Sequence, residues 1–203
     1  LYEERPELAL SRAEGRGILN AIHPTLRGDE WIAKKFQEAR KADGSPTPEW
    51  YICLLSYRLS SQEAEDLVRH FRFPGNLAKA IRDTVKLKGE GDKLSQPDSH
   101  PSQIYHTLRG YSEVSIRACI SASTSSIAAK NMEQYLERWQ SLKPHLDGTA
   151  LKAMGISQGP LLGKMLKALL EARLDGEVST VEEERSFVER KLSQGDLAEF
   201  KES

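Results

Sequence analysis

Four glycine and proline residues and three lysines crowd into one short stretch near the C-terminal end, at 152–167. A glycine-rich turn separates two helical patterns there, at 149–154 and 160–174. Pro160 suits the first turn of a helix, where its missing N–H would lack a partner anyway, and Gly155 suits a helix end with positive φ. A helix start carries unpaired N–H groups and about half a positive charge, which favours a phosphate. The candidate phosphate-binding residues are Lys152, Gly155, Gly159, Pro160, Gly163, Lys164 and Lys167.

The longer of these two helical patterns has an apolar stripe and a separate basic face. The spacing of three and four residues places Met165 and Leu169 on the stripe, whereas Lys164 and Lys167 fall on a face that we expect to be exposed. Taken alone, the glycines and proline also fit an ordinary helix start. The lysines are what favours an anionic ligand.

Other residue types that do chemistry lack the spacing that they need. The five histidines have neither the mutual spacing of a metal site nor a serine or cysteine placed as an activated nucleophile. No catalytic residue and no metal ligand is therefore predicted. The tryptophans and cysteines lie on apolar helical stripes, so we expect packing rather than base stacking, a disulfide or zinc binding: Trp31, Trp50, Trp139, Cys53 and Cys119.

The composition is that of a globular protein without a strong overall field. The 203 residues are 38% hydrophobic and 29% charged, with a formal net charge of -1, so nucleic-acid affinity would require local basic patches. No segment approaches the roughly 18 apolar residues of a membrane span, and no signal peptide pattern opens the chain. We expect a cytoplasmic protein without membrane contact. Because the chain begins with Leu1 in a helix-like run, we expect a longer parent protein.

The elements that must position the glycine-rich segment are all helices. Strand patterns are nearly absent and apolar residues recur with helical spacing, which predicts an all-α multi-helix bundle or elongated helical array. Near its C-terminal end this fold carries a glycine-rich element resembling a helix-hairpin-helix. The further helices expected are 8–22, 29–42, 50–59, 61–71, 77–85, 104–108, 114–120, 132–142 and a last one that begins at Thr180 with a capping box to Glu183.

One change in composition predicts a domain boundary. Between about 89 and 100, glycine, proline and serine accumulate with almost no apolar residues. We therefore predict a helical body subdomain at 1–90, a linker at about 89–100, and a helical tail subdomain at 101–203 that contains the hairpin.

About thirty residues around the hairpin resemble a known family. The matching runs are Leu151-Lys152-Ala153-Met154-Gly155, Gly159-Pro160-Leu161-Leu162-Gly163, Leu166 and Leu174-Asp175-Gly176-Glu177-Val178. This pattern resembles the C-terminal region of bacterial class II tRNA nucleotidyltransferases, which include CCA-adding enzymes, A-adding enzymes and poly(A) polymerases. The run from Gly17 to Pro24 and the helices through Leu87 look like the helical body of longer members. The resemblance implies that the hairpin binds RNA and that the partner is tRNA, gripped at its acceptor arm and elbow.

The same resemblance implies a catalytic domain that is missing here. In the family this head has a Gly-Ser turn and an Asp-x-Asp pair that holds Mg²⁺ against ATP or CTP. In this chain Gly44-Ser45 leads into Pro46 without a carboxylate pair. We therefore expect that the chain alone is not an enzyme and binds no cofactor, and that the head lies upstream in the same polypeptide.

A short acidic and basic motif partly matches the family's nucleotide-selecting sequence. Glu65-Asp66-x-x-Arg69 has the same residue types, in which Asp and Arg of the family read the incoming base. Charges at this spacing usually form a solvated helix face, and we interpret the motif in that way.

Two other classes of protein fit the same sequence. A helix-hairpin-helix module would bind DNA non-specifically through the backbone of 155–163, and would prefer duplex DNA to folded tRNA. A structural helical bundle for protein contacts would show no salt-dependent binding of nucleic acid.

Overall fold

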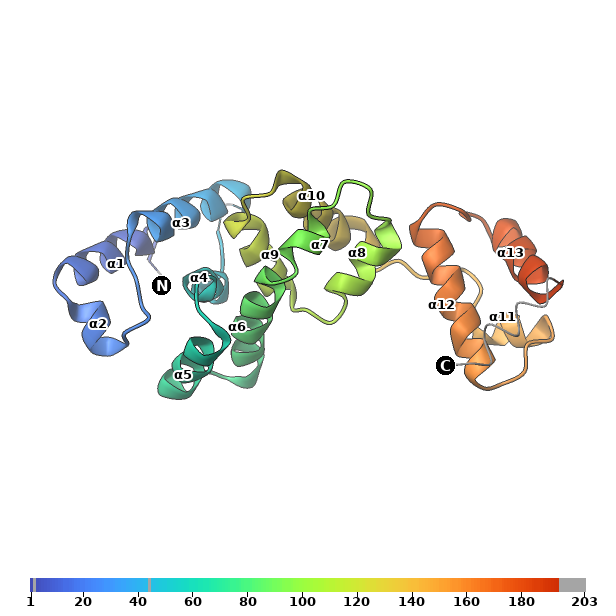
Figure 1. Ribbon diagram of the computed structural model, residues 1–203, viewed down its shortest axis with the longest axis horizontal. Helices are drawn as coiled ribbons and strands as arrows, with labels where there is room; N and C mark the ends of the chain where they lie inside the picture. The colour runs from blue at the N-terminus through green and yellow to red at the C-terminus, as the bar shows by residue number, and fades with distance from the viewer. Residues whose placement is uncertain (2, 44, 194–203) are drawn as a thin grey trace. The chain divides into compact units, whose positions relative to one another are not determined.

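The structure, a computed structural model, describes residue 1, residues 3–43 and residues 45–193. Within these ranges the chain forms helices and turns and no strand, which confirms the predicted all-α fold (Figure 1). The helices are α1 (Pro6–Gly15), α2 (Ile18–Ile22), α3 (Glu30–Asp43), α4 (Pro48–Ser56), α5 (Ser61–Phe71), α6 (Gly75–Lys88), α7 (Gly91–Leu94), α8 (Pro101–Leu108), α9 (Glu113–Ala122), α10 (Ser126–Gln134), the π-helix η1 (Tyr135–Trp139), α11 (Gly148–Ala153), α12 (Pro160–Leu174) and α13 (Val181–Ser193).

Several helices begin at the residues that their sequence predicts. The side chain of Asp29 accepts the backbone N–H of Ile32 at 3.0 Å and so caps the start of α3. Ser60 and Glu63 form a reciprocal capping box at the start of α5. The helix expected over 8–22 is instead divided into α1 and α2, because Gly17 adopts a left-handed φ of 70° between them.

The chain forms two compact units. Unit 1 contains Leu1–Asp98 and Thr107–Leu136, and unit 2 contains Ser99–His106 and Glu137–Ser203, of which the structure describes the residues up to 193. Helix α9 belongs to unit 1, where it packs against α4 and α6. The body subdomain at 1–90 and the tail subdomain at 101–203 stay a prediction. Residues 89–100 also include the short helix α7, whose Leu94 is buried and whose Leu94 carbonyl accepts the Asn131 amide at 2.9 Å.

The core of unit 1 lies where α3, α4, α6 and α9 meet. Phe36, Leu54 and Cys53 are fully buried there, and Trp50 is nearly so, as the sequence predicts. Burial raises the pKa of the Cys53 thiol to about 12, so this cysteine is a packing residue rather than a nucleophile. Cys119 is buried on α9, and both cysteines are free thiols, as expected.

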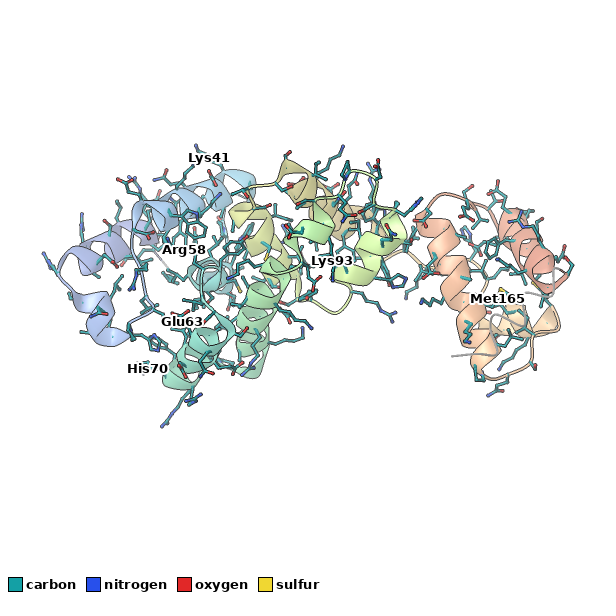
Figure 2. All side chains as sticks on the ribbon, viewed as in Figure 1. Lys41, Arg58, Glu63, His70, Lys93 and Met165 are labelled. Carbon is teal, nitrogen blue, oxygen red and sulfur yellow. The ribbon has the colours of Figure 1, made fainter. Side chains whose placement is uncertain are left out.

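The core of unit 2 forms around α12. Both α11 and α13 contact this helix, and Met165 and Leu169 of α12 are buried between them (Figures 1 and 2). Leu162 and Leu166 pack against the same core while remaining partly exposed. The apolar stripe predicted for this helix is therefore the surface that holds the glycine-rich hairpin in place.

Candidate nucleic-acid interface

The first half of the hairpin is fixed by caps at both ends of α11. The Asp147 carboxylate accepts the N–H groups of Thr149 and Ala150, each at 2.9 Å. At the other end, Gly155 has a φ of 94°, a conformation that side chains disfavour. The N–H of Gly155 donates to the Lys152 carbonyl at 3.0 Å, and the N–H of Ile156 donates to the Leu151 carbonyl at 3.2 Å. This pair of bonds is a Schellman motif, which ends α11 and turns the chain.

Ile156 anchors the hairpin to the core of unit 2. Its side chain is buried together with Leu151 and Met165, whereas residues 157–160 are exposed. The turn is therefore anchored to the core through Ile156, and its remaining residues are exposed to solvent.

The start of α12 lacks a side-chain cap. Gly159 occupies the N-cap position with a φ of 145°, and no side chain that the structure describes accepts a hydrogen bond from the first turn. Pro160 follows at the first helical position, as predicted, and no acidic residue lies in that turn. Such a start leaves N–H groups and the positive end of the helix dipole directed toward solvent.

Four of the candidate residues share one face of α12. Pro160, Gly163, Lys164 and Lys167 stand at spacings of three, four and seven residues, which places them along one side of the helix. Met165 and Leu169 occupy the side that faces the core. The structure therefore brings the open helix start and two lysines into one line.

The fold does not require a glycine at position 163. A Cβ atom built there would meet no heavy atom within 4 Å, and the φ of Gly163 is not positive. A glycine inside a helix costs about 1 kcal/mol relative to alanine. Gly155 and Gly159, by contrast, are explained by their own backbone angles. The absence of a side chain at 163 would allow a ligand to approach the helix backbone closely.

The lysines differ in their surroundings. Lys152 is exposed, and its ammonium lies 3.4 Å from the side-chain oxygen of Gln158 on the turn. Lys167 is exposed, and its Nζ lies 3.7 Å from Oε1 of Glu171, a pair that solvent weakens. Lys164 is half-buried. The lysines thus surround the hairpin on both the α11 and the α12 side.

A buried carboxylate that the sequence analysis missed holds the segment before α11. Glu184 of α13 is fully buried and accepts the N–H of His145 at 3.0 Å, the N–H of Leu146 at 2.8 Å and the Arg173 guanidinium at 2.8 Å. The His145 ring also contacts both Glu184 and Arg173. Burial by itself would raise the pKa of Glu184, but these donors outweigh burial and lower the pKa. Glu184 stands three and four residues before the buried Phe187 and Val188, so the helical period could have identified it.

The Glu65, Asp66 and Arg69 motif forms a solvated face on α5. Glu65 pairs with Arg82 of α6 at 2.5 Å, and Arg69 lies 3.3 Å from Asp66 with 74% of its side chain exposed. These groups pair with one another and with α6, which agrees with the predicted solvated helix face.

Within the described ranges no three histidine, cysteine or acidic residues are grouped so as to hold a metal ion. Nor does any described helix have the length and apolar character that a membrane span requires.

An all-helical array of this kind is the fold of part of the CCA-adding enzymes. The chain superposes on the Thermotoga maritima CCA-adding enzyme complexed with tRNA with a TM-score of 0.71 and 17% identity, over 95% of this chain and 49% of that chain. It superposes on an apo form of a CCA-adding enzyme with a TM-score of 0.69 and 17% identity, over 94% of this chain and 47% of the other.

Sequence comparison identifies the family. The profile of tRNA nucleotidyltransferase domain 2 matches residues 45–185, and the chain belongs to this family. The A-adding tRNA nucleotidyltransferase of Geobacter sulfurreducens is 24% identical over 213 residues, which is 94% of this chain and 23% of that protein. The CC-adding tRNA nucleotidyltransferase of Thermus thermophilus is 47% identical over 47 residues, 23% of this chain and 11% of that protein. The chain thus spans less than a quarter of these relatives and about half of the solved chains. The resemblance stated from the hairpin residues is confirmed.

Proposed function

We propose that the chain is the tRNA-binding region of a tRNA nucleotidyltransferase, which holds the acceptor arm and elbow so that the RNA 3′ end reaches a catalytic domain upstream in the same polypeptide. The observation that carries the proposal is the face of α12, where an uncapped helix start, Gly163 and two lysines lie in one line. Backbone N–H groups and ammonium groups recognise phosphates whatever the attached base. A solved CCA-adding enzyme of the same fold is complexed with tRNA, which supports RNA as the ligand.

The proposal divides the work between this chain and the catalytic domain. That domain would hold Mg²⁺ together with ATP or CTP, and this chain would bind and orient the RNA. The described residues offer no cluster of metal ligands, so we derive no chemical step from them. Such a role assigns the protein to the cytoplasm. The helix-hairpin-helix alternative gains no support from the two relatives, which are both tRNA nucleotidyltransferases.

Replacing Gly163 by alanine should separate binding from folding. A methyl group meets no atom of the chain, so the free energy of unfolding should stay the same or rise by up to about 1 kcal/mol. The affinity for tRNA should fall, because the new side chain keeps a phosphate from the helix backbone. Gly163→Val should weaken binding further.

The measurement is a tRNA titration with a thermal melt of each variant beside it. Gly15→Ala is the matched control, since Gly15 also lies in a helix with no atom within 4 Å of a built Cβ. Unchanged tRNA affinity in both Gly163 variants would remove this face from the RNA interface.

The chain by itself should transfer no nucleotide. Labelled ATP or CTP, Mg²⁺ and tRNA lacking its 3′ end are incubated with the 203-residue chain and, separately, with buffer. Incorporation is expected to equal that of the buffer control, because no Asp-x-Asp pair that could hold a metal against a triphosphate follows Gly44-Ser45 in the sequence. Incorporation above that control would contradict the proposed division of work and would direct attention to Glu65, Asp66 and Arg69.

A further inference from the structure

The end of α5 carries aromatic and basic residues in alternation, Arg69-His70-Phe71-Arg72-Phe73. Arg72 adopts the left-handed conformation, with φ 50° and ψ 45°, and is the one non-glycine residue with positive φ among those that the structure describes. Glycine or asparagine usually occupies this position at a helix end, because a longer side chain is disfavoured there. An arginine held in that conformation suggests a use for its side chain.

The turn at Arg72 stacks two phenylalanine rings. Their centroids lie 5.4 Å apart and their planes differ by 19°. Phe73 packs against the core formed by Leu67, Val68 and Leu77, so it fixes the position of Phe71. Phe71 itself remains 38% exposed, although Phe73 supports its ring on one side.

Two histidines complete the aromatic cluster. The His70 ring meets the edge of Phe71 at 4.9 Å, and the buried His23 ring lies 5.1 Å from His70 and 6.3 Å from Phe71. These contacts join the loop after α2 to the end of α5 and limit the motion of Phe71. We name the cluster of His23, His70, Phe71 and Phe73 the aromatic platform. It lies at one end of unit 1, where Figure 2 labels His70.

Two arginines are chain neighbours of the platform residues. The Arg72 side chain is exposed and forms no hydrogen bond or ion pair with a described residue. Arg69 is exposed and forms an ion pair with Asp66 at 3.3 Å. An exposed ring and, on the next residue, an unpaired guanidinium match the two parts of a nucleotide, a flat base and a phosphate.

We propose that the aromatic platform and Arg72 bind an unpaired nucleotide of single-stranded RNA. The base stacks on Phe71, and Arg72 pairs with the adjoining phosphate. A base inside a duplex is already stacked and cannot reach the ring, so the site selects single-stranded segments. A docking protein would have to supply an acidic group for Arg72 as well as an apolar surface, whereas RNA supplies both complements in every nucleotide. The site lies in unit 1 and is separate from the hairpin of unit 2.

The test uses a short oligoribonucleotide that carries one 2-aminopurine, as a single strand and as a duplex with its complement. Stacking quenches the fluorescence of this base, so the 203-residue chain should quench the single strand and bind the duplex more weakly. Phe71→Leu keeps an apolar side chain but removes the aromatic face, and should weaken single-strand binding about tenfold. Arg72→Gly should lower the slope of log K against log salt by about 0.7.

Thermal melts of each variant accompany the titrations. Glycine adopts the left-handed conformation of residue 72 without the penalty that a side chain brings, so Arg72→Gly should leave the melting temperature unchanged or higher. Ile127→Ala and Lys41→Ala are the controls, since Ile127 is as exposed as Phe71 and Lys41 lies at the opposite side of unit 1 from His70 (Figure 2). Both should bind like the original chain. The double variant Lys164→Ala/Lys167→Ala should retain the quenching, which distinguishes this site from the proposed hairpin interface.

The proposal is overturned if Phe71→Leu and Arg72→Gly bind the single strand as the original chain does, or if single strand and duplex bind equally well. A chain that binds no oligoribonucleotide at all would also overturn it, and would leave the platform as a surface for protein contact.

Discussion

Replacing Glu184 by glutamine should lower the free energy of unfolding of unit 2 by about 3 kcal/mol. The carboxylate is fully buried and accepts two backbone N–H groups and the Arg173 guanidinium. Glutamine offers one oxygen in place of two and leaves the Arg173 charge without its counterion. Hydrogen exchange of the Leu146 and Ile156 amides in increasing urea measures the loss within unit 2, whatever the stability of unit 1.

The exposed neighbour Glu182 supplies the control for this prediction. Glu182→Gln should change the free energy of unfolding by less than about 0.5 kcal/mol, because its side chain lies in solvent. Equal effects of the two substitutions would show that Glu184 does not stabilise the segment before α11.

The effect of Glu184 should also depend on pH. Because its pKa is lowered in the folded protein, its contribution is present above the unfolded-state value of 4.5 and is lost as the pH falls through the lower folded value. The difference between the original chain and Glu184→Gln should therefore be full at pH 7 and should shrink below about pH 4.5.

Much of the local structure could be predicted from the sequence, because it depends on neighbouring residues. Asp29 begins α3 and Pro160 begins α12, as capping and the geometry of proline require. The turn of the hairpin follows in the same way from Gly155. These features need no knowledge of the rest of the fold.

The features that were not predicted depend on residues far apart in the chain. Glu184 belongs to a run of three glutamates that suits an exposed first turn. The helical period places it on the buried side of α13, but does not show that it accepts the backbone N–H groups of His145 and Leu146, which lie 39 and 38 residues earlier. The packing of α9 on α4 and α6 likewise cannot be deduced from the composition of 89–100.

The candidate site also has features that the sequence predicts and features that depend on the folded structure. Its residues on α12 were found from helical spacing and from the family resemblance. The spacing could not show that Gly163 has open space in front of it, nor that Arg72 holds a left-handed conformation at the end of α5. Backbone angles and surrounding space emerge only when the whole unit has packed.

Replacing both Lys164 and Lys167 by alanine should weaken tRNA binding about 40-fold in 0.1 M salt. Each lysine that neutralises a phosphate contributes roughly 0.7 to 0.9 to the slope of log K against log salt, and the same amount in log K between 1 M and 0.1 M. Two contacts therefore contribute about 1.6 in log K. Lys167 is exposed and Lys164 is half-buried, and neither belongs to the buried core, so the melting temperature should change little. Lys130→Ala/Lys143→Ala, which removes the same charge elsewhere, should leave the slope unaltered.

The most direct test of tRNA recognition by the hairpin is a titration of the 203-residue chain with tRNA lacking its 3′ end. It is carried out at several salt concentrations, for the original chain and for Lys164→Ala/Lys167→Ala, with duplex DNA of equal length as competitor. We predict salt-dependent binding that the DNA displaces poorly, with a slope flatter by about 1.6 in the double variant. Preferential binding of the DNA, or an identical slope in the two proteins, would contradict the account.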